Sequence, residues 1–264
     1  MRCQHLKSRK QHLSKGTWLF AFVLIIFCQG CQISPAASSA PKIILWAWER
    51  RENLEFIDTR KFGVAFLAQT LELKGDEVRL IPRRQPLKVK PETYLIAVTR
   101  IEIPKKSSDW VALSEKQRST MVEFVLKTLD LKNVSAVQLD FDVTVSEREF
   151  YRLLLADLRI KLPANVGLTI TALASWCASD SWLSGLPIED AVPMAFVMGA
   201  DDKMIRDFLA SGQDWQEPKC RGSYGIAIDE PLKMKFKPNR KFYLFNPNPN
   251  GWQPTDLDRL PDGV

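Results

Sequence analysis

The chain has 264 residues, of which 45% are hydrophobic and 26% are charged, a balance that is typical of a globular protein and excludes an intrinsically disordered one. Its formal net charge is +6, but five of the 37 basic residues lie in residues 1–30, which contain no acid. The remainder is nearly neutral, with 32 basic and 31 acidic residues. Because a nucleic-acid-binding domain needs a basic surface on its folded part, we expect no nucleic-acid partner.

The first 30 residues are organised like a targeting signal. Basic residues up to Lys15 precede the apolar run 18–27, which is too short for a comfortable membrane span and suits the h-region of a signal peptide. The run ends in Cys-Gln-Gly-Cys at 28–31, which resembles the cleavage site of a bacterial lipoprotein. We predict a signal peptide over residues 1–30 and lipidation of Cys31. Cleavage before Cys28, ordinary secretion and an uncleaved anchor are the alternatives.

Residues 31–41 are rich in Ala, Ser and Pro and predict a tether, followed by a single barrel-like domain over residues 42–264. A lipid on Cys31 would anchor this domain to a membrane of the cell envelope, facing the periplasm. Gln32 follows the cysteine, where Asp would favour retention in the inner membrane of many Gram-negative bacteria. The outer membrane is therefore the expected location.

Cysteine and histidine usage narrows the possible chemistry. Beyond the signal and the anchor only Cys177 and Cys220 remain, and an oxidising compartment favours a disulfide between them. Both histidines, His5 and His12, lie in the signal. The domain therefore lacks an imidazole for a zinc site or for a Ser-His-Asp or Cys-His nucleophile, and we expect neither a metal nor a cofactor.

Alternating strands and helices predict an α/β fold. Apolar runs predict eight strands, over 43–48, 63–67, 94–101, 135–142, 167–173, 191–198, 224–229 and 242–245, and capping signals predict helices over 114–130, 146–161 and 201–211. Eight such units suit a (β/α)8 TIM-like barrel with a parallel sheet. We expect irregularities: a β-hairpin around Gly75-Asp76 after the second strand, and room for only one short helix at the C-terminus.

The fourth predicted strand carries the most informative pattern. Alternation places Gln138, Asp140, Asp142 and Thr144 on one face, and an uninterrupted apolar series, Val137, Leu139, Phe141 and Val143, on the other. In a closed parallel barrel the polar face points into the lumen, and its last residues line the C-terminal mouth where chemistry occurs. The two aspartates therefore mark a candidate site.

The other predicted strand ends supply carboxylates and tryptophans, a combination that is typical of carbohydrate sites. We predict catalytic roles for Asp140, Asp142 and Glu230, and substrate-binding roles for Trp46, Trp48, Glu49, Arg100, Trp176, Asp229 and Asn246. Each group has a structural alternative. The two first-strand tryptophans could be core packing, Asp229-Glu230-Pro231 could simply form a turn, and Asp140 and Asp142 could be a buried pair held by Arg100.

The sequence Leu139-Asp-Phe-Asp142 resembles the Asp-x-Asp-x-Glu signature of glycoside hydrolase family 18. In that family the Glu two residues beyond the second Asp protonates the glycosidic oxygen. Thr144 occupies that position here and cannot supply the proton, so the resemblance does not imply the family's reaction. Glu147 and Glu149 follow in the next predicted helix, where capping accounts for them.

A closer resemblance extends over most of the chain after the signal. It is to the bacterial domain-of-unknown-function family 3142, and it implies a barrel of uncharacterised activity. The matching segments are Leu45-Trp-Ala-Trp-Glu49, Gln138-Leu-Asp-Phe-Asp142, Phe150-Tyr151, Thr171-Ala-Leu-Ala-Ser-Trp-Cys177, Val192-Pro-Met194 through Met198-Gly199, and Ile228-Asp-Glu-Pro231.

Three functions remain open at this point. The protein could be a glycoside-hydrolase-like enzyme that acts on a polysaccharide of the cell envelope. It could be a non-catalytic glycan- or peptidoglycan-binding lipoprotein that uses the same mouth. It could also be a structural envelope protein whose acids are buried in ion pairs.

Overall fold

The computed structural model describes residues 40–103 and 110–260. The predicted signal, the anchor Cys31 and nearly all of the tether lie outside these residues, and so do 104–109 and 261–264. The described residues belong to one compact unit. Within them, no helix has both the length and the apolar character needed to cross a membrane.

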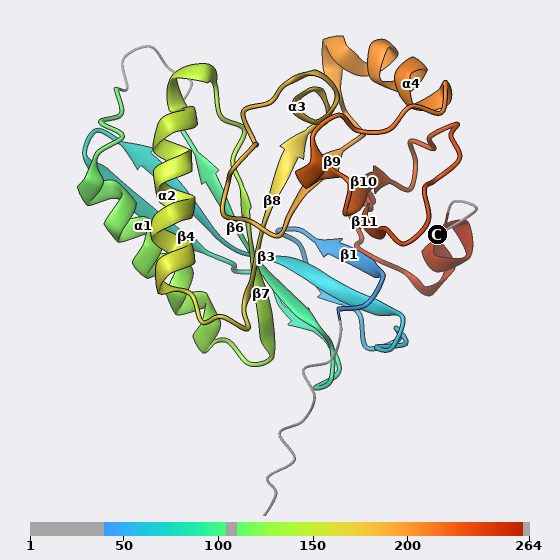
Figure 1. Ribbon diagram of the computed structural model, residues 1–264. Coiled ribbons are helices and arrows are strands. Elements are labelled where there is room, and N and C mark those ends of the chain that lie inside the picture. Colours follow the sequence, from blue (N-terminus) through green and yellow to red (C-terminus); the bar gives the residue numbers. More distant parts are fainter. Residues whose placement is uncertain (1–39, 104–109, 261–264) are drawn as a thin grey trace, which may run out of the picture. The chain divides into compact units, whose positions relative to one another are not determined.

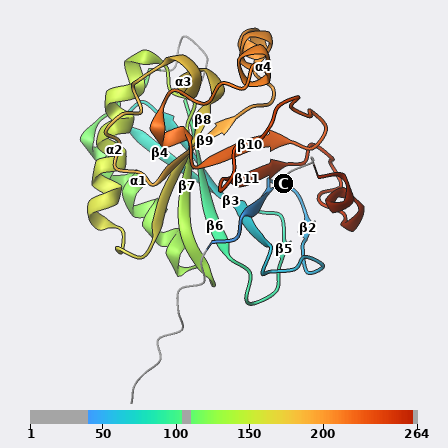
Figure 2. The same ribbon diagram turned by 45° about the vertical axis from the view of Figure 1, so that its right-hand side comes forward.

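Eight parallel strands close into a barrel (Figures 1 and 2). In order they are β1 (Ile43–Ala47), β3 (Phe62–Lys74), β6 (Leu95–Glu102), β7 (Val134–Asp140), β8 (Gly167–Leu173), β9 (Asp190–Met194), β10 (Ser223–Ala227) and β11 (Lys241–Phe245). Each pairs with the next, and β11 pairs back with β1 through Ile43–Phe242 and its neighbours. The predicted TIM-like barrel and all eight of its strands are confirmed.

The helical coat covers only part of the barrel. The helices are α1 (Glu115–Lys127), α2 (Arg148–Lys161), α3 (Ala174–Ser179) and α4 (Asp202–Ala210), with 3-10 turns at Thr128–Asp130, Val145–Glu147, Gly199–Asp201, Pro218–Cys220 and Pro254–Arg259. α1 and α2 lie side by side along the barrel (Figures 1 and 2). Near β1, a two-stranded sheet of β2 (Glu52–Asn53) and β5 (Leu87–Lys88) stands instead of a helix. The last element is a single 3-10 helix, in line with the short C-terminal helix predicted.

The hairpin expected around Gly75 is present, but its first arm is the second barrel strand itself. β3 continues to Lys74 and pairs antiparallel with β4 (Glu77–Pro82). Gly75 occupies the turn with a φ of 55°, a left-handed conformation that favours glycine. The pairing of β3 with β6 shifts register between Leu67 and Gln69, which is a β-bulge.

Alternation along the strands separates two cores. Ile44, Trp46 and Tyr243 belong to a cluster inside the barrel, together with Ala65, Ile96, Val98, Ala136 and Val192. Val137 and Leu139 of β7 lie in the larger cluster outside it, which also contains α2 residues such as Tyr151. Gln138 and Asp140 point the other way, as the sequence predicts, because successive side chains of a strand alternate between its faces.

Several predicted element ends are wrong by a few residues. β7 ends at Asp140 instead of 142, β9 at Met194 instead of 198, and β10 at Ala227 instead of 229. Local turns stop each strand: the Val143 amide donates to the Phe141 carbonyl, Val197 has a φ of 50°, and the Glu230 amide donates to the Ala227 carbonyl. These tight contacts cannot be read from hydrophobic alternation.

Helix caps were predicted with mixed success. At α1 the Ser114 hydroxyl accepts from the Gln117 amide (3.2 Å) and the Gln117 side chain accepts from the Ser114 amide (3.0 Å), which confirms that box. Before α2 the Glu147 carboxylate accepts from the Thr144 amide (2.6 Å). The cap therefore begins at Thr144, not at Ser146, and α2 itself begins at Arg148.

Cys177 and Cys220 form the predicted disulfide, with Cα atoms 5.8 Å apart. Cys177 lies in α3, which follows β8, and Cys220 lies in the 3-10 turn that precedes β10. The bridge closes a sequence separation of 43 residues, so it restricts the unfolded chain and ties the segments on either side of β9 together.

Asp190 is a buried carboxylate at the N-terminal end of β9. It is only 7% exposed, and its Oδ1 has no hydrogen-bond partner among the described residues. A Cβ at Gly222 would lie 2.5 Å from this oxygen, so the close packing requires glycine there. Burial is the main reason that the pKa of Asp190 is raised from 3.8 to about 6, against the opposing effects of the nearby Ser223 hydroxyl and of the charges on Lys241 and Arg240.

This burial predicts a pH dependence of stability. The folded state binds the Asp190 proton more tightly than the unfolded state does. The protonated carboxyl group therefore adds to the free energy of unfolding, fully below pH 4, and this stabilisation is lost as pH rises through 6. Wild type should lose about 2 kcal/mol of its free energy of unfolding between pH 4 and 7, and we expect Asp190→Asn to abolish that loss, measured by urea denaturation. The exposed Asp76→Asn is the control and should retain the wild-type profile. Identical profiles for wild type and Asp190→Asn would contradict this prediction.

Candidate functional site

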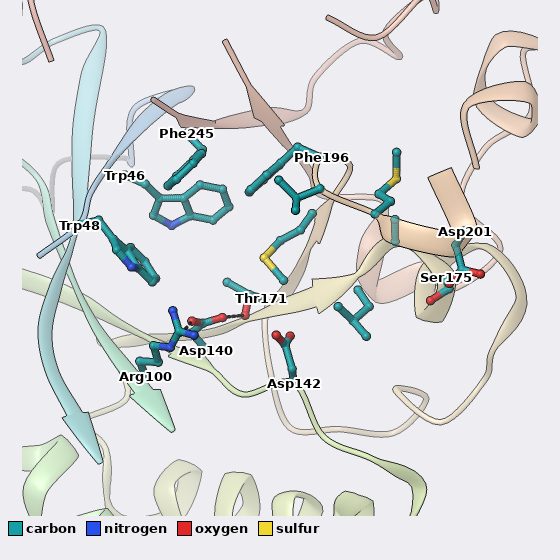
Figure 3. A pocket seen from close by; sticks show the side chains of 15 residues that line it. Trp46, Trp48, Arg100, Asp140, Asp142, Thr171, Ser175, Phe196, Asp201 and Phe245 are labelled. Carbon is teal, nitrogen blue, oxygen red and sulfur yellow. Dashed lines mark hydrogen bonds and ion pairs between the residues drawn. The ribbon is translucent and has the colours of Figure 1, made fainter. Parts of the chain in front are cut away.

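A cavity of about 370 Å³ opens at the C-terminal ends of the barrel strands (Figure 3). Its lining residues come from the ends of six strands and the loops that follow them: Trp46, Trp48, Arg100, Asp140, Asp142, Thr171, Leu173, Ala174, Ser175, Met194, Phe196, Val197, Met198, Asp201 and Phe245. The position is the one where barrels of this architecture carry their sites. Five residues predicted from the sequence meet there: Trp46, Trp48, Arg100, Asp140 and Asp142.

One side of the cavity is aromatic. Figure 3 shows Trp46, Trp48, Phe196 and Phe245 on this side. The rings of Phe196 and Phe245 stack with centroids 5.2 Å apart, and Trp46 meets Phe196 edge-on at 6.1 Å. These rings support one another, so the apolar wall is preformed.

Trp46 is fixed from behind by buried hydrogen bonds. Its indole Nε1 donates to Gln138 Oε1 (2.9 Å), and its carbonyl accepts from Trp252 Nε1 (2.8 Å). It is 2% exposed, so it is both part of the barrel core and part of the cavity floor. Trp48, two residues along on the same face, is half-buried and closer to solvent.

The opposite side of the cavity is polar and acidic. Asp140 accepts a hydrogen bond from the Thr171 hydroxyl (2.7 Å), and its Oδ2 lies 4.0 Å from Arg100 Nε. Asp142 follows on the same side and is exposed at the mouth. Burial raises the pKa of Asp140, and the nearby charge of Asp142 adds to this effect, while Thr171 and Arg100 oppose it. Asp140 is thus a buried carboxyl group at an open cavity whose surroundings favour its protonated form more than water does.

Arg100 connects the two sides. Its Nε lies 2.8 Å from Glu102 Oε1 and its guanidinium carbon lies 5.8 Å from the centroid of the Trp48 ring. A guanidinium over an indole face is attracted by the ring quadrupole. The cation therefore orients Trp48 while it also lies beside Asp140.

Glu230, which was predicted to be catalytic, does not line the cavity. Its Oε2 accepts from the Val197 amide and from Arg206 Nη2, both at 3.1 Å. Val197 is a β-branched residue with a φ of 50°, a strained backbone, and its side chain is 78% exposed. Glu230 therefore holds the loop that presents Phe196 to the cavity.

Four further predicted residues also lie outside the cavity lining. Glu49 accepts from the amides of Arg84 and Gln85, and Asp229 is exposed after β10. Trp176 is 5% exposed in α3, where its ring packs edge-on against Trp182 at 4.9 Å. Asn246 is 1% exposed, and its side chain donates to Asp256 and accepts from the Asn248 amide.

The cavity also contains residues that sequence reasoning missed: Thr171, Ser175, Phe196, Asp201 and Phe245. Strand parity could have found two of them, since Thr171 and Phe245 share the inward faces of β8 and β11 with Thr169 and Tyr243. Phe196, Ser175 and Asp201 lie beyond the strand ends, so alternation carries no signal for them. Among the described residues no group of His, Cys, Asp and Glu side chains could hold a metal ion.

Comparison with known proteins shows distant likeness in structure alone. No family model matches the chain, and no curated protein matches it. A crystal structure of the chitinase domain of the spore coat protein CotE from Clostridium difficile has a TM-score of 0.42 at 14% identity and covers 64% of this chain and 51% of its own. A crystal structure of the Bacillus cereus spore cortex-lytic enzyme SleL has a TM-score of 0.45 at 14% identity and covers 72% of this chain and 52% of its own. The chain thus spans about half the length of these structures.

The contacts of Glu230 predict a local loosening when it is removed. Glu230→Ala should increase hydrogen exchange of the Val197 amide at least tenfold, because that amide loses its acceptor, while exchange in the β strands stays unchanged. Its exposed neighbour supplies the control, Asp229→Ala, for which no change is expected. Unchanged exchange at Val197 in Glu230→Ala would show that Glu230 does not hold the loop.

Proposed function

We propose that the protein binds a carbohydrate chain in the cavity at the C-terminal mouth of the barrel. The observation that carries this proposal is the opposition of an aromatic wall, with Trp48 and Phe196, to a polar wall, with Arg100, Asp140 and Asp142. A sugar ring has apolar C–H faces and a rim of hydroxyl groups. Indole and phenyl faces cover the former, while carboxylates accept from the latter and a guanidinium donates to them.

The size and construction of the cavity support binding over a purely structural role. Its volume of about 370 Å³ lies within the range of small-molecule sites. If Asp140 served only in a structural ion pair, a closed and packed mouth would be expected. Instead the carboxylate lines an open space and meets Arg100 only at 4.0 Å.

Glycoside hydrolysis is the second candidate, and the environment of Asp140 favours it. A hydrolase needs one carboxyl group that keeps its proton and a second that is ionised. Burial raises the pKa of Asp140, and Asp142 is the exposed acid beside it. Against this candidate, Thr144 stands where family 18 has its proton donor, and its backbone amide takes part in the cap of α2.

Anchoring to the cell envelope is the further part of this proposal. The sequence of the first 31 residues supports a lipid on Cys31, with the barrel facing the periplasm and the outer membrane favoured by Gln32. The resemblance to the domain-of-unknown-function family 3142 names no reaction, and no family model matches the chain.

The binding proposal predicts the effect of removing one indole. Trp48→Ala should weaken binding of a neutral trisaccharide at least tenfold, equivalent to about 1.4 kcal/mol, because the stacking face is lost. Isothermal titration against a panel of envelope-type oligosaccharides measures this. Trp110→Ala removes a 64% exposed indole outside the cavity lining and is the matched control. If wild type binds no oligosaccharide in the panel, the proposal is wrong.

Hydrolysis is tested on the same panel by product release. Asp142→Asn should reduce the rate at least a hundredfold if the pair is catalytic, since general acid–base groups contribute about that much or more. Binding without turnover, unaffected by Asp142→Asn, would instead assign the cavity to a non-catalytic glycan-binding protein.

Lipidation predicts a difference between two cysteines three residues apart. Cys31→Ser should abolish incorporation of radiolabelled palmitate and release the protein from the membrane fraction, because the acceptor thiol is gone. Cys28→Ser should remain labelled. Loss of label in Cys28→Ser with retention in Cys31→Ser would move the anchor to Cys28.

A further inference from the structure

One part of the barrel wall rises above the mouth. β3 has thirteen residues, but its pairing with β1 ends at Ala47–Phe66. Beyond Phe66, β3 continues between β4 and β6 as a three-stranded extension. Figures 1 and 2 show this extension beside α1.

The bulge in β3 decides which residues of the extension face the mouth. After the register shift, Gln69 points to the helix side, where its Nε2 donates to the Phe124 carbonyl (3.1 Å). Leu71 and Leu73 are fully buried on that same side. Thr70 therefore lies on the opposite face of the sheet, the face that points into the lumen where the barrel is closed.

The extension thus presents an open polar face, which we call the shelf. Register places Thr70 beside Ile81 and Arg100, and Glu72 beside Arg79 and Glu102. We define the shelf by six of the residues that line its groove, Thr70, Arg79, Ile81, Arg84, Arg100 and Glu102; Trp48, Glu49, Leu67 and Pro82 complete the lining. The groove has a volume of about 490 Å³.

The shelf groove and the mouth cavity share two lining residues, Trp48 and Arg100. These two are in contact, with the guanidinium carbon 5.8 Å from the indole centroid. A ligand that lies against Trp48 in the cavity can therefore continue past Arg100 into the groove without crossing a separate wall. Such continuity suits a polymer chain better than a single sugar.

The charges on the shelf leave one cation available. Arg79 Nε donates to Glu72 (2.8 Å), and Arg100 pairs with Glu102 (2.8 Å). Glu49, also in the groove, is held by the amides of Arg84 and Gln85 at 3.1 Å each. The Arg84 side chain is exposed, and within the described residues its guanidinium makes no hydrogen bond or ion pair. A guanidinium matches the geometry of a carboxylate or a phosphate.

We propose that the shelf is a second subsite of the mouth, and that the ligand is an extended glycan chain bearing anionic groups, one of which pairs with Arg84. This inference rests on the proposed carbohydrate-binding function. It adds that the chain crosses the Trp48–Arg100 contact, and that the anion is a carboxylate or a phosphate.

Chain length and charge test the proposal on the full-length protein in detergent. The probes are oligogalacturonates of two and eight units, the methyl-esterified eight-unit chain, and a phosphate-bearing teichoic acid oligomer. We expect the longer acidic chain to bind at least tenfold more tightly than the dimer. Arg84→Ala should reduce that gain about tenfold and leave dimer affinity unchanged. Lys132→Ala, the same charge change in the loop before β7, is the control.

The outcomes separate the two proposals. Tighter binding of the carboxylated or of the phosphorylated chain supports the shelf and identifies the anion. Three results overturn the shelf subsite: the dimer and the octamer bind equally well, the esterified and the acidic octamers bind equally well, or Arg84→Ala has no effect. Loss of dimer binding in Trp48→Ala would still uphold the mouth. Absence of binding to every one of these probes also overturns the shelf, while binding of a neutral oligosaccharide from the envelope-type panel still upholds the mouth.

Discussion

Closure of the sheet is the constraint on which the rest of the structure depends. β1 pairs with both β11 and β3, so the eight parallel strands have no free edge at that point. Once the sheet is closed, each strand must place one set of side chains inside and the other outside. The inner set packs as its own cluster around Trp46, and the outer set packs under α1 and α2. At the mouth the inner rows end in aromatic side chains on one side and in polar side chains on the other.

Departures from a regular barrel shape this mouth. The bulge in β3 turns the strand extension so that its apolar side meets the helix α1 and its polar side faces the opening. The loop after β9 turns at Val197, and Glu230 holds that turn from the end of β10. The first feature shapes the shelf beside the mouth, and the second presents Phe196 to the aromatic wall of the cavity. Strained or irregular backbone at such positions is common beside functional sites.

Prediction from the sequence succeeded where one residue's environment followed from local pattern. Alternation identified Asp140 as inward-facing, position at a predicted strand end marked Trp46 and Arg100, and the structure brings the three together. Glu230 and Trp176 also follow strand ends in the sequence, but neither lines the cavity: Glu230 pairs with Arg206, and Trp176 packs against Trp182. Their positions depend on partners far along the chain, such as Arg206 for Glu230, and no periodicity records those contacts. Phe196 was missed for the same reason.

The sequence by itself determined the barrel, the number of its strands, the face of β7 that points inward and the cysteines that form the disulfide. These follow from alternation, capping residues and composition, which act over a few neighbouring residues. Only the tertiary structure decided that Asp140 meets Thr171, that Arg100 lies over Trp48, and that Arg84 stands open beside the mouth. Asp140 and Thr171 lie 31 residues apart in the sequence, on the neighbouring strands β7 and β8. Trp48 and Arg100 lie 52 residues apart, at the ends of β1 and β6, which both pair with β3. The order of the strands in the sheet brings these residues together, and local sequence pattern does not record that order.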